Sequence, residues 1–242
     1  MDLLNVRTLP FLTRRNYYYE FQHIVTWSIL AGLIEGGQFA SVVVSKSFGG
    51  SERLIAIATT TPVAALLCSL VWGMVCVGRA KLRVLTVLVA ATALCAGAVF
   101  AIPGTRAGAV WFLVQMGAAQ ALIAGVVTVR SAVWRVNYPR SARGRIAARL
   151  QGARVITSVV TVLGAAVLCD RDPGAYRYIY PVAAACGIAS VLFLPYIHIR
   201  GERAEIRRHR QPRFLGDVRT GLAEPFDQTA ILPRGHVVRR IS

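Results

Sequence analysis

Charged residues, and acidic residues above all, are scarce in this sequence. Asp, Glu, Lys and Arg make up 16% of the 242 residues, and only 11 residues are acidic against 28 basic ones. Soluble domains carry about 25% charged residues. The charges also occur in short clusters between long uncharged stretches, which excludes an ordinary soluble domain.

Several functional signatures are missing as well. The five cysteines lie in apolar segments without a CxxC pair or a Cys/His cluster, so we expect them to be small buried hydrophobic residues. No pattern indicates a catalytic residue, a bound metal or a cofactor, and we expect no enzyme. The first apolar run, from Phe21, is too long for the core of a cleavable signal peptide, so we expect it to remain in the mature protein.

Six apolar segments are long enough to cross a bilayer as helices, which takes roughly 20 residues. Glu35 interrupts the first segment, and the fifth has only 15 uncharged residues before Asp170, so its helix must begin near Ala148. We expect an all-α integral membrane protein, a six-helix bundle with spans at residues 21–44, 54–77, 84–105, 107–129, 155–169 (extended to about 148) and 178–199.

The basic residues predict the orientation of these spans. With both termini on the cytoplasmic side, the inner segments hold 23 Lys and Arg residues and the outer loops hold 5, as the positive-inside rule requires. Basic loops of this kind need no nucleic-acid partner. We therefore expect a cytoplasmic segment at residues 1–20, a membrane domain at 21–199 and a basic cytoplasmic tail at 200–242, in a bacterial inner membrane.

Polar residues inside the spans are the candidate site. Glu35 is the only acid near the middle of a span, and its spacing from Gln38 predicts that both lie on one helical face. Glu35 is either a substrate or proton-coupling carboxylate or a buried group that holds helices together. Gln115 and Gln120 in the fourth span point to different faces, so at most one is expected to share a cavity with Glu35.

Other polar positions suggest weaker alternatives. Pro62 predicts a kink in the second span, and Arg130 is expected to extend toward the cytoplasmic surface rather than to bind an anion. Small residues four apart, such as Gly117, predict close helix packing. Asp170 and Asp172 in an outer loop leave open a metal-dependent transferase.

Two cytoplasmic loops carry a family resemblance. Between the second and third spans, Gly78-Arg79-Ala80-Lys81, with Gly73 before it, resembles the end of the signature of the major facilitator superfamily, although the spacing is shorter and the acid is missing. Between the fourth and fifth spans, the motif is similar to that family's PxxxRGR pattern, with Pro139, Arg143, Gly144 and Arg145.

The resemblance implies one six-helix half of such a transporter. Spans one and four would then line the central cavity, two and five would border the other half, and three and six would face outward, each half being built from inverted three-helix repeats. We expect either a truncated or split N-terminal half, or a half that assembles with a second half or a second copy of itself.

These observations predict a secondary transporter that moves a small solute by alternating access, with proton coupling through Glu35 as an addition. Its partners would be the lipid bilayer, the solute and protons. The alternative is a non-transporting membrane scaffold or regulator whose basic tail recruits a partner or lipid.

Overall fold

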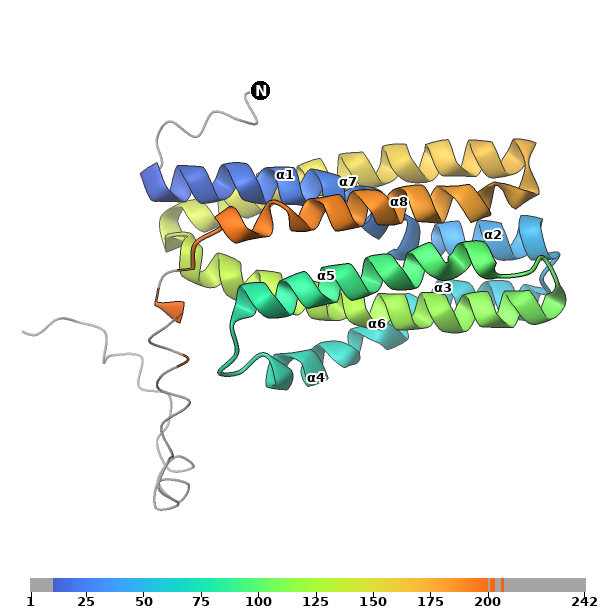
Figure 1. Cartoon of the computed structure of the whole chain (residues 1–242), viewed down its shortest axis with the longest axis horizontal. Coiled ribbons are helices and arrows are strands. Elements are labelled where there is room, and N and C mark those ends of the chain that lie inside the picture. The colour runs from blue at the N-terminus through green and yellow to red at the C-terminus, as the bar shows by residue number, and fades with distance from the viewer. Residues whose placement is uncertain (1–10, 200, 203–205, 207–242) are drawn as a thin grey trace, which may run out of the picture.

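The chain folds into a bundle of helices that lie side by side along one axis (Figure 1). The computed structural model describes residues 11–199, 201, 202 and 206, and the regular elements among them are all helical. The α-helices are α1 (Phe11–Ile34), α2 (Gln38–Phe48), α3 (Glu52–Leu66), α4 (Cys68–Val75), α5 (Lys81–Gly97), α6 (Arg106–Asn137), α7 (Arg140–Arg171) and α8 (Tyr176–Val191). Short 3-10 turns are η1 (Ala98–Ala101), η2 (Pro173–Ala175) and η3 (Leu194–Tyr196).

The helices are compatible in length and composition with insertion into a membrane. Five helical segments are each long and apolar enough to cross a membrane. The bent pair α1 and α2, which meet at 50°, adds a sixth if the two helices form one broken span. The predicted all-helical architecture is thus confirmed for the described residues. The five single segments are Glu52–Val75, Lys81–Ala101, Arg106–Asn137, Arg140–Arg171 and Pro173–Tyr196.

The connection between the fourth and fifth spans is much shorter than expected. α6 continues to Asn137 and α7 begins at Arg140, so only Tyr138 and Pro139 separate them. The spans predicted at residues 107–129 and from about 148 left the residues between them as a long loop, which was wrong because the arginine and alanine residues of this region favour helix. Pro139 fixes the break, since the residue before a proline is driven out of helical geometry, and Tyr138 is extended.

The second span continues through Pro62 inside α3 and is interrupted five residues later, at Leu67. Fewer of its side chains are covered than in any other span. In its most apolar stretch 11% of residues are buried, compared with 17% in α7 and 56% in α6. The second and fifth spans are therefore the most exposed, whereas the apolar third and sixth spans, α5 and α8, pack against each other.

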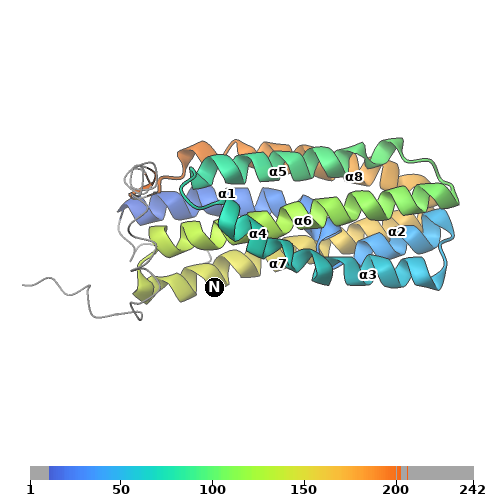
Figure 2. The ribbon, with the colours of Figure 1, turned by 90° about the horizontal axis from the view of Figure 1, so that it is seen from below.

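The helices pack in an order with internal symmetry. α7 lies against α1, α1 against α8, α8 against α5, α5 against α6, and α6 against α3 and α4 (Figures 1 and 2). This order is unchanged when the first three spans are exchanged for the last three, although α2 also packs against α3, a contact that α6 and α7 barely repeat. The sequence showed no such repeat.

Small residues allow two of these contacts to be close. A Cβ atom on Gly32 of α1 would lie 2.8 Å from Ser158 Cα of α7, and one on Gly117 of α6 would lie 3.3 Å from Thr61 Cγ2 of α3. The first crossing joins the first span to the fifth, and the second crossing joins the fourth span to the second. The two crossings therefore correspond when the first three spans are exchanged for the last three. The close packing predicted for Gly117 is confirmed.

The described ends of the chain meet at one end of the bundle, where α6 also turns into α7 (Figure 1). Asn16 Nδ2 donates to the His198 carbonyl at 2.8 Å, and His198 N donates to Asn16 Oδ1 at 3.1 Å. The rings of Tyr19 and Tyr196 stack with centroids 4.8 Å apart. Residues 1–10 and most of the tail predicted for 200–242 lie outside the described residues.

Candidate functional site

The candidate site lies at the break between α1 and α2, midway along the bundle (Figure 1). Gly36 and Gly37 have φ angles of 78° and 69°, the left-handed region that glycine enters without penalty. A Cβ atom on Gly37 would lie 2.2 Å from the Ala58 carbonyl oxygen of α3, whereas one on Gly36 would meet nothing within 4 Å. The two glycines therefore end α1 and hold the broken span against α3.

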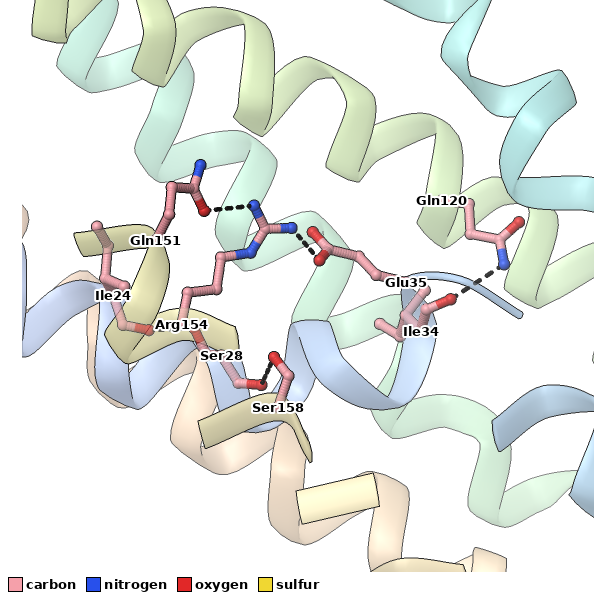
Figure 3. A network of polar contacts seen from close by, with 8 residues as sticks. All are labelled: Ile24, Ser28, Ile34, Glu35, Gln120, Gln151, Arg154 and Ser158. Carbon is pink, nitrogen blue, oxygen red and sulfur yellow. Dashed lines mark hydrogen bonds and ion pairs between the residues drawn. The ribbon is translucent and has the colours of Figure 1, made fainter. Parts of the chain in front are cut away.

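The break frees the Glu35 carboxylate to form an ion pair with Arg154 of α7 (Figure 3). Arg154 Nη1 also donates to Gln151 Oε1 at 3.2 Å. The Gly32–Ser158 crossing brings α1 and α7 together, and the two charged side chains reach toward each other beside it. The side chains of Glu35 and Arg154 keep 24% and 20% of their surface exposed, so the pair remains accessible.

Gln120 of α6 completes the polar part of the site. Its Nε2 donates to the Ile34 carbonyl at 3.1 Å, which supplies a partner for a carbonyl at the end of α1. The side chain is only 4% exposed, and its Oε1 has no hydrogen-bond partner among the described residues. Gln120 therefore holds the break in place with its nitrogen and leaves a buried acceptor.

These groups line a groove of about 350 Å³ between the break, α3, α6 and α7. Glu35, Arg154 and Gln120 supply the polar atoms, and the walls are otherwise apolar. A few convergent polar groups in an apolar groove are typical of small-molecule sites. The apolar walls include Pro62, Val63, Leu66, Ile123 and Val127.

The structure separates the other two predicted amides from this groove. Gln38 is exposed at the start of α2 and does not line the groove; the expectation that it shares a helical face with Glu35 was wrong, because the helix stops between them. Gln115 Nε2 donates to the Cys95 carbonyl and so bridges α6 to α5. Of the two glutamines in the fourth span, only Gln120 lies beside Glu35.

A second polar cluster, which the sequence did not reveal, lies on α1 nearer the turn between α6 and α7. Both carboxylate oxygens of Glu20 accept hydrogen bonds, one from Trp134 Nε1 and one from the Tyr138 hydroxyl. Glu20 is 2% exposed. Burial, and then the Glu20 charge, raises the pKa of the Tyr138 phenol, which therefore stays protonated and donates.

Arg130 and His23 extend this cluster. The Ser190 carbonyl can only accept, so His23 Nδ1 carries the proton at 3.1 Å, and Nε2 accepts from Arg130 Nη2 at 3.2 Å. Glu20, Glu35 and Arg154 are close enough to act on the Arg130 charge. The prediction that Arg130 extends to the surface was wrong, since the Arg130 side chain is buried inside the helix bundle.

The loop motifs have identifiable structural roles. Arg143 Nη2 donates to the carbonyls of Arg135 and Tyr138, at 2.7 and 3.0 Å, and so caps the end of α6. The backbone N–H of Lys81, at the start of α5, donates to Glu202 Oε1 at 2.7 Å, as expected for an acid at a helix N-terminus. The other motif residues are Gly73, Arg79, Pro139, Gly144 and Arg145, all exposed, and Gly78, which has φ 69°.

Asp170 and Asp172 lie at the end of the bundle opposite the turn between α6 and α7. Asp170 forms an ion pair with Lys46, and Asp172 Oδ1 accepts from the Gly174 N–H at 2.7 Å. Within the described residues no group of three or more His, Cys, Asp or Glu side chains is arranged to hold a metal ion.

Sequence reasoning found Glu35 because it is an acid in an apolar run, but it missed Glu20 and the partner Arg154. Glu20 lies at the boundary of the predicted first span, among aromatic residues, where an acid looks like part of a loop. Arg154 lies at the depth of Glu35 because α7 continues as one helix through Arg140–Arg171.

Comparison of the whole chain with protein-family models, curated proteins and solved structures finds no match in any of the three.

Proposed function

We propose that this chain is a six-helix half of a secondary transporter of the major facilitator type, and that the groove around Glu35 and Arg154 is its solute-binding surface. The protein would be integral to a bacterial inner membrane with both termini cytoplasmic. The arginine-rich helix ends on either side of the turn between α6 and α7 lie at the same end of the bundle as the described chain ends, which supports that orientation.

The observation that carries the proposal is the partly exposed ion pair midway along the bundle. Charged side chains at membrane depth face the bundle interior or a water-filled cavity, because lipid solvates them poorly. The groove that holds Glu35 and Arg154 is walled in part by α3 and α7, which belong to the two least covered spans. A cavity shared with a second unit is therefore the expected environment of this pair.

The packing order supports the same proposal. Exchange of the first three spans with the last three leaves the main helix neighbours unchanged, apart from the α2–α3 contact, as in folds built from inverted repeats with a midplane site. The second and fifth spans, which would border the second unit, are the least covered. That unit would be a second six-helix half or a second copy of this chain.

Proton coupling would use Glu35, which has to leave Arg154 to exchange a proton with the cavity. A solute that competes for either partner would couple its own binding to that step. Replacement of the carboxylate by an amide, Glu35→Gln, removes the titratable group while keeping the side-chain size.

The proposal is tested by uptake of radiolabelled amino acids, sugars, organic cations and carboxylates into proteoliposomes that contain the full chain. We expect saturable uptake of one solute class, lost in the double variant Glu35→Gln/Arg154→Gln, which removes both charges together and leaves no unpaired ion. Absence of saturable uptake for every class, with the chain alone and with a co-expressed second half, would contradict the transporter assignment.

A further inference from the structure

The groove presents both signs of charge side by side. Figure 3 shows Arg154 and Glu35 facing each other, with Gln120 on the far side of Glu35. Gln120 Oε1 is buried and is directed away from the Glu35 carboxylate. The ion pair is therefore the charged feature of the groove that a ligand meets.

We infer that the groove binds a small zwitterion with a compact apolar body, of the class of apolar α-amino acids. Its ammonium group lies on Glu35, and its carboxylate lies on Arg154. The inference rests on the proposed function, because it names the solute that the groove carries.

Charge balance is the first argument for a zwitterion. Entry of a monovalent cation or anion at the Glu35–Arg154 pair would leave one of the two protein charges without a partner at membrane depth. Removal of one partner from a poorly solvated ion pair is strongly unfavourable. A zwitterion supplies a new partner to both side chains at once: its ammonium group replaces Arg154 as the partner of Glu35, and its carboxylate replaces Glu35 as the partner of Arg154.

Hydrogen-bonding capacity gives the orientation. Arg154 uses one N–H toward Glu35 and one toward Gln151, and a guanidinium has five, so it retains donors for a ligand carboxylate. The Glu35 carboxylate accepts hydrogen bonds on two oxygens, so it can bind an ammonium group. The donor and acceptor ends of the groove therefore match the two ends of one short zwitterion.

The walls define the rest of the ligand. Val63, Leu66 and Val127 supply aliphatic surface beside the ion pair. The volume of about 350 Å³ lies at the small end of the range for ligand pockets, roughly 300–1,000 Å³. A branched aliphatic side chain fits this surface better than a sugar, whose hydroxyl groups would lack partners on these walls.

Leucine and its two truncated analogues test the inference by binding. The full chain in nanodiscs would be titrated with leucine, with 3-methylbutylamine, which lacks the carboxylate, and with 4-methylpentanoate, which lacks the ammonium group. We expect leucine to bind at least about tenfold more tightly than either analogue, because each analogue loses charge-assisted hydrogen bonds. Equal affinity of leucine and either analogue, or no leucine binding at millimolar concentration, would overturn the inference.

Variants separate the ligand contacts from folding. The double variant Glu35→Gln/Arg154→Gln removes both charged contacts at similar size, and we expect leucine binding to be at least about tenfold weaker; the control Gln115→Met, in α6 but away from the groove, should leave leucine affinity unchanged. The charge exchange Glu35→Arg/Arg154→Glu preserves a pair and provides a folded control if single charge variants do not fold. Unchanged leucine affinity in Glu35→Gln/Arg154→Gln would contradict the assigned positions of the ammonium and carboxylate groups.

Binding and flux distinguish this inference from the proposed function. Leucine binding without leucine uptake would support the zwitterion site and contradict transport by the chain. Saturable uptake of another solute class, without leucine binding, would support transport and overturn the zwitterion assignment.

Discussion

The first span carries two glutamates in opposite surroundings. Glu20 is 2% exposed and both its oxygens accept hydrogen bonds from neutral donors, Trp134 and Tyr138. Glu35, further along the same span, is partly exposed and forms an ion pair with one cation, Arg154. The comparison indicates that an acid held on every side by its own fold stabilises the bundle, whereas an acid with a single partner at the edge of a groove remains available to a ligand.

The largest effect is expected from Glu20→Ala. The substitution leaves two donors, Trp134 and Tyr138, without an acceptor and removes an acid that interacts with buried Arg130. Loss of one member of a buried charged network costs about 3–5 kcal/mol. Thermal unfolding of the purified protein should show a large fall in stability, and a change below about 1 kcal/mol would contradict the structural role of Glu20.

The two glycines of the break form a matched pair. Gly37→Ala should lower stability by more than Gly36→Ala, because both positions have a positive φ but only the Cβ of residue 37 would collide with the Ala58 carbonyl. We expect about 1 kcal/mol for the conformational strain at either position and a further 1–3 kcal/mol for the collision. Equal unfolding temperatures for the two variants would show that the break does not pack against α3 as described.

Glu35→Gln should affect function more than stability. The variant leaves Arg154 without its partner, but the pair is partly exposed, so the fall in stability should be smaller than for Glu20→Ala. Uptake, if it is proton-coupled through this carboxylate, should lose its dependence on pH. Flux that keeps the same pH dependence in the variant would remove Glu35 from the coupling step.

The smallest effect is expected from Gln115→Leu. The variant loses the hydrogen bond to the Cys95 carbonyl, which is worth about 0.5–1.5 kcal/mol. Solute uptake should stay at the level of the unaltered chain. A loss of uptake comparable to that of the Glu35→Gln/Arg154→Gln variant would contradict the separation of the two glutamines of α6.

The sequence predicted the apolar segments and singled out Glu35 as an acid inside one of them, because uncharged runs and a lone acid are properties of single positions. It did not predict the break after Ile34, although Gly36 and Gly37 stand directly beside Glu35, since glycine pairs also occur at packing faces of continuous helices. It placed the residues of Arg130–Gly152 in a loop because arginine is rare in membrane spans, whereas α6 and α7 carry them as ordered helix ends.

Partners distant in the chain were beyond sequence reasoning. Arg154 reaches Glu35 across 119 positions, and Trp134 reaches Glu20 across 114. Both contacts depend on which helices are neighbours, and that order follows from side-chain packing at crossings such as Gly32–Ser158. A single sequence does not contain this information in a local pattern.

The most direct test asks whether the groove holds water in the membrane. Two exposed valines form a matched pair: Val63, 69% exposed, lines the groove, and Val87 of α5, 65% exposed, lies outside it. In a variant whose five cysteines are replaced, single cysteines at these positions would be treated with a membrane-impermeant thiol reagent in proteoliposomes. We expect rapid labelling of Val63→Cys and none of Val87→Cys; equal labelling of the two, or no labelling of Val63→Cys, would contradict a solvated solute site beside Glu35 and Arg154.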